Sequence, residues 1–230
     1  DYDHETPVIT VAGVTNGDCT NDPINVTVDF TEPVTGFDAT DVDIAGNGTV
    51  GAISTLDNIT YEFEITGMTT EEDLNINIAA DAAQDYAWNS TLAATEFSLF
   101  YDITDPTPTM ETVGLNPANY EPMTVAIDFN EIHGVTGFDQ VADIVVTNGG
   151  YNNLTQIDGN NYTIDISTDS EGDVIVTIVG GAAEDCAGNG NNEVSYTIHY
   201  DVTKPVPTIS STAVENGGYI NDPTIKITDT

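Results

Sequence analysis

The chain has 230 residues, of which 39 are Asp or Glu and only two are Lys or Arg, so its formal net charge is −37 at pH 7. A chain of this charge cannot neutralise phosphates, which excludes nucleic acid as a partner. No apolar run approaches the roughly 18 residues that span a bilayer, which excludes direct membrane insertion. Hydrophobic residues make up 39% of the chain, enough to form packed cores rather than a disordered polymer.

The first hundred residues are predicted to form short strands separated by turns. Segments such as "INVTVDF" and "TYEFEIT" alternate apolar with polar side chains and are rich in Ile, Val, Thr, Tyr and Phe. Gly, Asn, Asp and Pro interrupt them, and no segment keeps a helical period for three turns. We expect seven strands, at 8–13, 24–31, 41–45, 49–53, 61–66, 74–80 and 95–101.

The same pattern then begins again. Tyr2, Tyr101 and Tyr200 recur at an interval of 99 residues, and each precedes an Asp and a proline-bearing linker. "DFTEPVTGFD" returns as "DFNEIHGVTGFD", and "AAQDYAWNS" returns as "AAEDCAGNG". A fixed period indicates one structural unit used several times. The sequence predicts repeats at 1–102 and 103–201, and the first strands of a third at 202–230.

Seven strands in about 99 residues predict an all-β fold, with tandem immunoglobulin-like sandwiches. The partial third repeat is either a segment of a longer array or a pair of strands completed by another chain. Cys19 and Cys186 occupy non-equivalent positions in the two repeats. We therefore expect both to be ordinary small apolar residues, with an intermolecular bridge as the alternative.

Acidic side chains should gather at one end of each sandwich. Strands that alternate in direction bring every second connection to the end where the linker enters, together with that linker. The residues predicted to meet there are Asp3, Glu5, Glu32, Asp38, Asp41, Asp85 and Asn89 in the first repeat. Their counterparts in the second are Asp102, Asp105, Glu131, Asp139, Asp143, Asp185 and Asn189, and Asp201 begins the next linker.

No Lys or Arg precedes residue 204, so these carboxylates have no permanent cationic partner within the two repeats. Converging carboxylates would repel one another by several kcal/mol at an intermediate dielectric constant. Ca²⁺ accepts six to eight oxygen ligands at flexible angles. We therefore predict Ca²⁺ at the joints, although Asp and Asn are also common turn formers without any metal. The prolines of the linkers should stiffen the same joints.

The motifs "FTEPVTGFDATDV", "AAEDCAGNGN" and "YDVTKPVP" resemble the bacterial and archaeal Ig-like repeats of large cell-surface proteins. The resemblance covers both complete repeats and the start of the third, but Trp88 replaces Gly188 and Ser90 replaces Gly190. It implies a structural role in a surface layer or filament. The alternative is the extender region of a calcium-dependent adhesin or carbohydrate-binding surface protein. The expected partners are copies of the chain or neighbouring repeats, and cations, in a saline extracellular setting.

The remaining motifs carry less weight. No catalytic motif is present, so the sequence predicts no enzyme. Trp88 is expected to pack at a joint, with sugar stacking as the alternative, and His199 is expected to be an ordinary strand residue. Asn-x-Ser/Thr sequons predict glycosylation at Asn25, Asn47, Asn58, Asn89, Asn153 and Asn161. Asn89 cannot easily be both a glycan site and a metal ligand, so one of those two predictions should fail.

Overall fold

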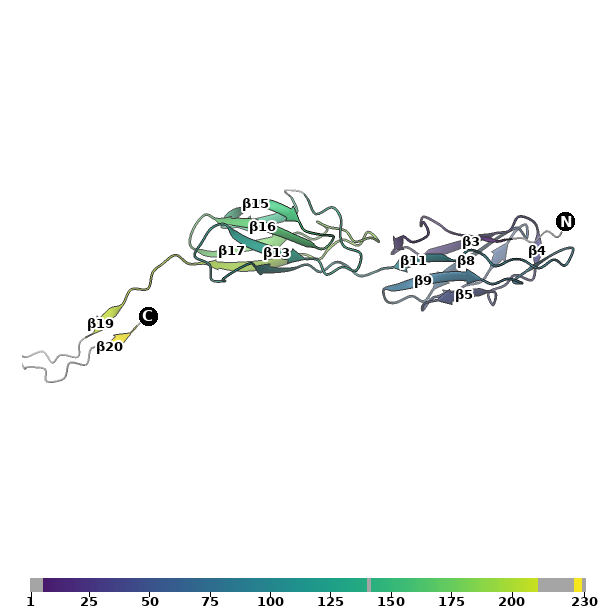
Figure 1. Ribbon diagram of the computed structural model, residues 1–230, viewed down its shortest axis with the longest axis horizontal. Helices are drawn as coiled ribbons and strands as arrows, with labels where there is room; N and C mark the ends of the chain where they lie inside the picture. Colours follow the sequence, from purple (N-terminus) through teal and green to yellow (C-terminus); the bar gives the residue numbers. More distant parts are fainter. Residues whose placement is uncertain (1–5, 140–141, 211–225, 229–230) are drawn as a thin grey trace, which may run out of the picture.

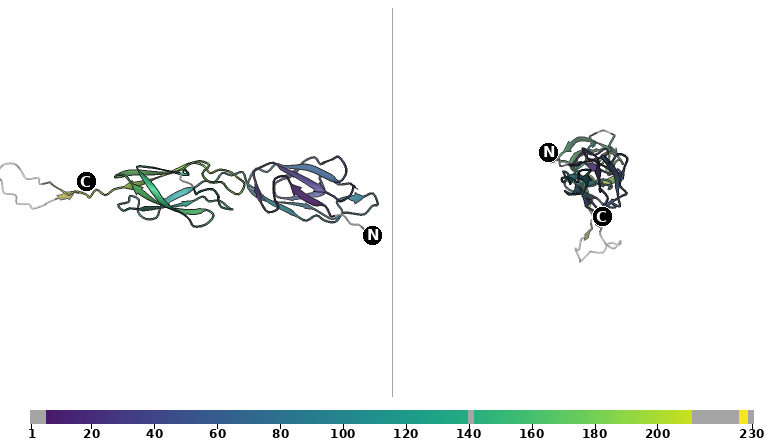
Figure 2. Two further views of the ribbon diagram at one scale, coloured as in Figure 1. Left: turned by 90° about the horizontal axis from the view of Figure 1, so that it is seen from above. Right: turned by 90° about the vertical axis from the view of Figure 1, so that its right-hand side faces the viewer.

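The computed structural model describes residues 6–139, 142–210 and 226–228. Two elongated β-sandwiches follow one another along the long axis of the molecule, and the chain leaves the second at the end farthest from the first (Figures 1 and 2). All regular structure within the described residues is strand, which confirms the all-β prediction. None of these residues belongs to a helix that could cross a membrane. The predicted ligands Asp3 and Glu5 lie outside the described residues.

Repeat 1 packs two main sheets face to face. The first has the order β1 (Val8–Val11), β3 (Ile24–Asp29), β8 (Thr60–Thr66) and β6 (Thr49–Val50), with β7 (Ser54–Thr55) also paired to β8. The second has the order β2 (Cys19–Thr20), β11 (Phe97–Tyr101), β9 (Glu72–Ile78) and β5 (Val42–Ala45). A short pair, β10 (Gln84–Asp85) with β4 (Val34–Thr35), ties together two connecting loops.

Repeat 2 has the same plan with fewer short strands. One sheet has the order β12 (Thr109–Thr112), β13 (Met123–Asp128), β16 (Asn161–Thr168) and β15 (Gly149–Gln156). The other has the order β14 (Ile144–Thr147), β17 (Gly172–Ile178) and β18 (Val194–Tyr200). Beyond it, β19 (Thr208–Ser210) pairs antiparallel with β20 (Lys226–Thr228).

The alternating sequence pattern builds each core directly. Along β3, Ile24, Val26 and Val28 are buried, while the residues between them are exposed or half-buried. This is expected when successive side chains of a strand point to opposite faces. Each core also contains three aromatic rings in edge-to-face contact, a geometry that aromatic rings prefer. The rings are Phe30, Phe37 and Tyr61 in repeat 1, and Phe129, Phe138 and Tyr162 in repeat 2.

The prediction for the cysteines is wrong. Cys19 and Cys186 form a disulfide, with their Cα atoms 5.5 Å apart and a sequence separation of 167 residues. Cys19 lies on β2 of repeat 1, and Cys186 lies in the loop between β17 and β18 of repeat 2. A bridge between two repeats needs no equivalence within either repeat, and for that reason comparing equivalent positions missed it.

Candidate metal centre at the joint between the repeats

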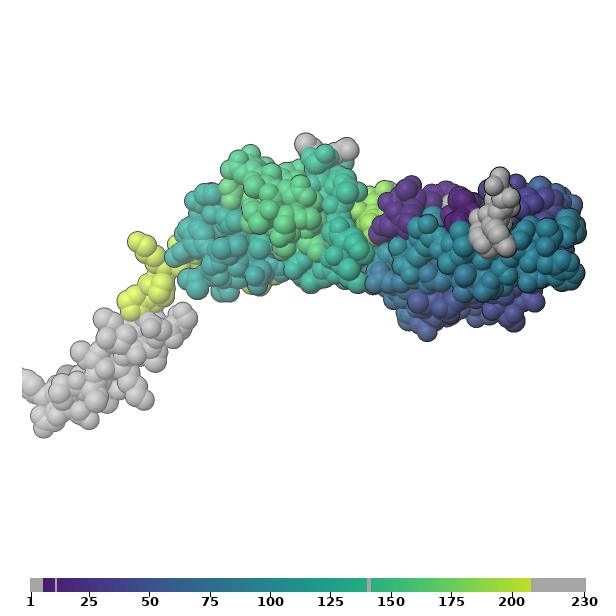
Figure 3. Space-filling view, turned by 45° about the vertical axis from the view of Figure 1, so that its right-hand side comes forward, coloured from purple at the N-terminus to yellow at the C-terminus, as the bar shows by residue number. Residues whose placement is uncertain are grey.

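The joint begins where β11 leaves repeat 1. β2 runs parallel to β11, with Cys19 opposite Phe100 and Thr20 opposite Tyr101. The backbone N–H of Asp102 then donates to the Thr20 carbonyl over 3.0 Å. This bond fixes Asp102 against the end of repeat 1 that faces repeat 2. In a space-filling view, atoms of the two repeats meet at this joint (Figure 3).

Three carboxylates converge at the joint. Asp102 comes from the linker, Glu131 from the loop after β13, and Asp185 from the loop between β17 and β18. One oxygen of each lies within 4.8 Å of the others. Asp102 is 2% exposed, Asp185 is 5% exposed, and Glu131 is half-buried. The structure thus brings together three of the predicted ligands, contributed by both sides of the joint. We call these three residues the joint cluster.

Asp185 is oriented by its own loop. One of its carboxylate oxygens accepts hydrogen bonds from the backbone N–H groups of Ala187 (2.8 Å) and Asn189 (2.9 Å). The other accepts from the side-chain amide of Asn189 over 2.8 Å. These bonds are those of a turn-forming Asp. The first oxygen then uses both of its lone pairs, whereas the second keeps one, so the turn role and a ligand role through the second oxygen are compatible.

Asn189 links the two repeats through its side-chain amide. Its Nδ2 also donates to the Asp102 carbonyl over 3.0 Å, and its Oδ1 accepts from Asn21 Nδ2 over 2.8 Å. The backbone N–H of Asn192 donates to the Pro106 carbonyl over 3.0 Å. Asn189 therefore acts as a hydrogen-bonding bridge between the repeats, and its role as a metal ligand stays a prediction.

The electrostatics of the joint cluster follow from burial without a cationic partner. Burial raises the pKa of Glu131 to about 7, and the nearby carboxylates of Asp102, Asp185 and Glu71 add to the shift. Burial also raises the pKa of Asp102, against the hydrogen bond from the Thr104 backbone N–H, which lowers it. Both shifts disfavour the charged forms. The cluster is therefore suited to binding a proton or a metal cation.

The disulfide lies beside the joint cluster. A ring nitrogen of His133 lies within 4.8 Å of the sulfur atoms of both Cys19 and Cys186, and the ring contacts Phe100 edge-on, with centroids 4.6 Å apart. Both sulfur atoms are committed to the disulfide, so this group is not a thiolate metal site in the oxidised protein. His133 slightly offsets the raised pKa of Asp102 by its charge.

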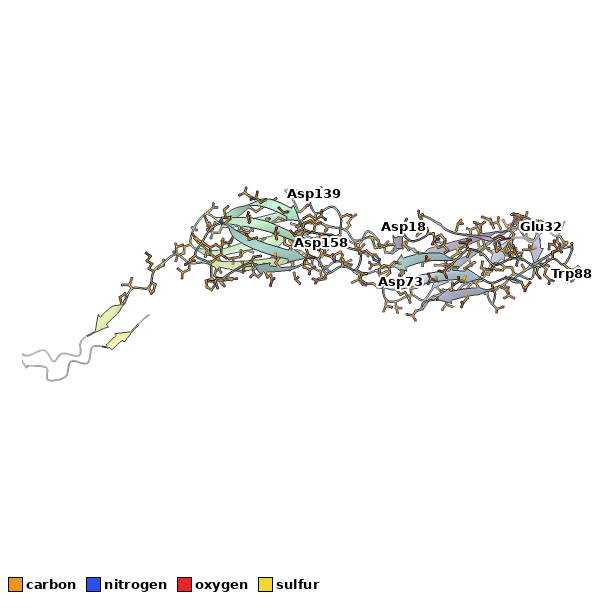
Figure 4. The ribbon with its side chains drawn as sticks, in the orientation of Figure 1. Asp18, Glu32, Asp73, Trp88, Asp139 and Asp158 are labelled. Atoms are coloured by element: carbon orange, nitrogen blue, oxygen red, sulfur yellow. A yellow bond between two sulfur atoms is a disulfide. The ribbon has the colours of Figure 1, made fainter. Side chains whose placement is uncertain are left out.

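The opposite end of repeat 1 has a turn at Asp85 and Asn89 that is equivalent to the turn at Asp185 and Asn189. Glu32 and Trp88 lie there, whereas Asp18 and Asp73 lie at the end facing repeat 2 (Figure 4). Asp85 accepts hydrogen bonds from the Ala87 and Asn89 backbone N–H groups and from the Asn89 side chain, over 2.7, 2.8 and 2.7 Å. The bonds from Asn89 are the main reason that the pKa of Asp85 is lowered.

The substitution of Trp88 for Gly188 leaves the turn unchanged. Both residues adopt a left-handed backbone conformation, with φ of 68° for Trp88 and 86° for Gly188. The hydrogen bonds around Asp85 and Asp185 are correspondingly the same. Trp88 is 82% exposed, so within the described residues it does not pack at a joint as the sequence analysis predicted.

The other predicted ligands lie outside the joint cluster. The Asp38 backbone N–H donates to the Asp41 carboxylate (2.8 Å), and the Asp139 N–H donates to that of Asp143 (3.1 Å). These bonds stabilise the loops that precede β5 and β14. Asp105 and Asp201 are exposed.

Four of the six sequon asparagines are exposed, and two are half-buried. The exposed residues are Asn25, Asn47, Asn58 and Asn153. The half-buried ones are Asn89, which donates to Asp85, and Asn161, which donates to Asp158. His199 lies on β18 and pairs with the Asp173 carboxylate across the sheet, as an ordinary strand residue does.

The sequence analysis did not select Glu71, His133 or Asn21. Glu71 immediately precedes β9 and acts on the joint cluster only through its charge. The signal that could have identified Asn21 and Glu71 is their position in connections at the C-terminal end of repeat 1. The sequence predicted ligands only at the N-terminal end of each repeat.

A family model described as "Bacterial Ig-like domain" matches residues 3–100 and again residues 102–202. The chain belongs to the bacterial Ig-like domain family. This confirms the resemblance given by the repeated motifs. No curated protein matches the chain.

Solved structures similar to the two Ig-like repeats include two proteins of Yersinia pseudotuberculosis and part of a bacterial S-layer protein. InvD is 17% identical, with a TM-score of 0.41, and the match covers 91% of this chain and 63% of that one. The adhesin InvE is 14% identical, with a TM-score of 0.30 and coverages of 86% and 59%. The N-terminal part of the bacterial S-layer protein SbsC is 14% identical, with a TM-score of 0.28 and coverages of 85% and 44%. The chain therefore spans less than two thirds of each of these structures.

Proposed function

We propose that these Ig-like repeats are a structural part of an extracellular prokaryotic surface layer or filament, and that Ca²⁺ bound at the joint cluster stabilises the connection between them. The observation that carries the proposal is the convergence of Asp102, Glu131 and Asp185 from two repeats. No Lys or Arg occurs between residues 6 and 203 to neutralise them.

The donor set suits a hard cation. Carboxylate oxygens, with backbone carbonyls and water, are the ligands that Ca²⁺ prefers, and its flexible coordination suits a site shared by two domains. Bound Ca²⁺ would offset the repulsion between the carboxylates and hold the ends of the two repeats together. We propose no catalytic role, and the partners are neighbouring repeats and cations.

The disulfide supports the extracellular setting. Disulfides persist in oxidising surroundings and are rare in the cytosol of mesophiles. A net charge of −37 also suits a saline medium, where ions screen the repulsion between surface carboxylates.

The test is a thermal melt at constant ionic strength. The protein is melted in EDTA, in millimolar Ca²⁺, in Mg²⁺, and in Na⁺ at matched ionic strength. We expect the melting temperature to be highest in Ca²⁺, because a ligand that binds only the native state stabilises that state. Equal melting temperatures in Ca²⁺ and Na⁺ would reject a specific joint site and leave general salt screening.

A second candidate is an adhesive or carbohydrate-binding role. Tyr86 is 68% exposed and Trp88 is 82% exposed on one loop at the outer end of repeat 1. Exposed aromatic rings can stack on sugars. Glycan-array binding that is lost in Trp88→Ala, with an unchanged melting temperature, would favour this role over a purely structural one.

A further inference from the structure

The Cys19–Cys186 disulfide joins the two repeats by a covalent path that is much shorter than the backbone between these residues. The shortest path along covalent bonds from any point before Cys19 to any point after Cys186 passes through the two sulfur atoms. It omits residues 20–185, which contain every strand from β3 to β17. Most of both hydrophobic cores lies in this closed loop.

We propose that this disulfide is a tension bypass, which shields residues 20–185, and thus most of both repeats, from force applied along the molecule. Tension entering before Cys19 crosses to Cys186 and leaves through β18. The residues in the closed loop lie off this path, so the pull does not act on them through the backbone. The Ig-like repeats would then serve as a tether that does not lengthen under load.

The strands on the tension path are already extended. β1 pairs antiparallel with β3 along Val8–Val11, and β18 pairs antiparallel with β17 along Val194–Tyr200. A strand rises about 3.2–3.4 Å per residue, close to the limit of about 3.3–3.6 Å for a fully extended chain. Straightening these segments therefore releases little length.

The direction of pulling also favours resistance. β18 ends at Tyr200, where the chain leaves repeat 2, and Cys186 is bonded to Cys19 of repeat 1 at the joint. A pull between them acts along β18. The pull enters and leaves on the β18 side, and β17 lies off the tension path, so the ladder hydrogen bonds between the two strands are not pulled apart.

The bypass can be opened chemically. Cys186 is exposed and Cys19 is half-buried, so a dithiol reductant can reach the bridge. Its thiolate attacks one sulfur and the other cysteine leaves as a thiolate. The second thiol of the reductant then completes its own disulfide and releases the first cysteine. Opening the bridge exposes residues 20–185 to tension. Because the sequence separation is 167 residues, full extension then gains about 550–600 Å.

The test is single-molecule force extension of the 230-residue chain, flanked on both sides by reference domains whose unfolding steps are known. The oxidised protein is compared with the Cys19→Ser/Cys186→Ser variant without reductant. We expect the fully unfolded variant to be longer than the fully unfolded oxidised protein by about 550–600 Å, the contour of the closed loop. Equal contour lengths would overturn the proposal.

A second measurement does not depend on how well the variant folds. The oxidised protein is held at constant force while a dithiol is added. We expect a delayed extra extension from the oxidised protein and none that depends on the dithiol from the double variant. Long unfolding steps from the oxidised protein before any dithiol is present would contradict the bypass. The result is expected in EDTA and in Ca²⁺ alike, so it is independent of the proposed joint site.

Discussion

Asp102 and Asp201 occupy equivalent positions but have different surroundings. Each follows a Tyr at the end of the last strand of its repeat, and each accepts the backbone N–H of a Thr two residues later, over 3.0 Å and 2.8 Å. The local turn is the same. Asp102 is nevertheless 2% exposed, whereas Asp201 is exposed.

The difference comes from what the structure places beside each Asp. Glu131 and Asp185 of the following repeat surround Asp102, while near Asp201 the Glu171 carboxylate accepts the Thr203 hydroxyl over 2.8 Å. The covalent bridge also differs, because Ala118 pairs with Tyr200 as Thr20 pairs with Tyr101. Pro117 therefore stands where repeat 1 has Cys19. The local sequence therefore forms the turn, and the contact with the next repeat creates the acidic cluster around Asp102.

The largest expected effect separates the two aspartates. Asp102→Asn should remove most of the stabilisation by Ca²⁺, which is about 2.7 kcal/mol when Ca²⁺ is at 100 times its dissociation constant. Asp201→Asn should retain it. Chemical denaturation in Ca²⁺ and in EDTA measures both.

The same two variants should also differ in stability in EDTA, where no Ca²⁺ is bound. Since burial raises the pKa of Asp102, its ionised form is unfavourable in the folded protein without a cation. Asp102→Asn should therefore be more stable than the wild type in EDTA at pH 7.5, while Asp201→Asn should match it. The reverse order would contradict a strained cluster at the joint.

Glu131 should make stability depend on pH in EDTA. Its pKa is 4.5 without perturbation and about 7 when folded, so the folded protein retains a proton that the unfolded chain has lost. Stability from this group is present below about pH 4.5 and is lost as the pH rises to about 7. We expect Glu131→Gln to flatten this slope and to gain about 1–2 kcal/mol at pH 8, after allowance for solvent screening.

Glu62→Gln is the matched control for this prediction, because Glu62 is exposed on β8 and does not belong to the joint cluster. It should leave the slope between pH 4.5 and 7 unchanged. Urea denaturation at several pH values is the measurement. If the free energy of unfolding of Glu131→Gln still falls between pH 4.5 and 7, a group other than Glu131 causes the pH dependence.

The two equivalent turns should respond in opposite directions. Trp88 is exposed and left-handed, so Trp88→Gly should stabilise repeat 1 by up to about 1 kcal/mol, from relief of backbone strain. A Cβ at Gly188 meets nothing within 4 Å, so Gly188→Ala should cost repeat 2 about 1 kcal/mol through its φ of 86° alone. Calorimetry of the single variants measures both. If both variants change stability in the same direction, the left-handed backbone is not the cause.

The smallest effect concerns Glu71. Its charge is one of the weaker contributions to the raised pKa of Glu131, so Glu71→Gln should lower that pKa slightly and add a few tenths of a kcal/mol in EDTA. Glu171→Gln, its counterpart beside Asp201, should not change it. The carboxyl ¹³C shift of Glu131 during a pH titration reports the difference.

The sequence predicted the architecture well because the strands carry their own signal. Alternation along β3 and β8 identified both, and the predicted edges lie within two residues of the observed ones. Two-residue strands such as β4 and β10 could not be found this way. They form because two loops meet across repeat 1, which no local pattern encodes.

The joint was only partly predictable. The alternation of strand directions placed Asp102, Glu131 and Asp185 at one end, and the structure brings them within reach of one another. The same reasoning, applied to both ends of each repeat, would have put Cys19 and Cys186 at the same joint. Burial of Glu131, and the use of Asn189 as a bridge to Asn21, depend on how two folded surfaces meet.

The disulfide also bears on how the protein survives proteolysis. A single cut in any loop between residues 20 and 185 opens a closed ring, so the two resulting pieces remain covalently joined. On a non-reducing gel, the nicked chain would run as one species, and only a reductant would separate the fragments. A protein exposed to secreted proteases could thus lose a peptide bond in either repeat without shedding the part beyond it.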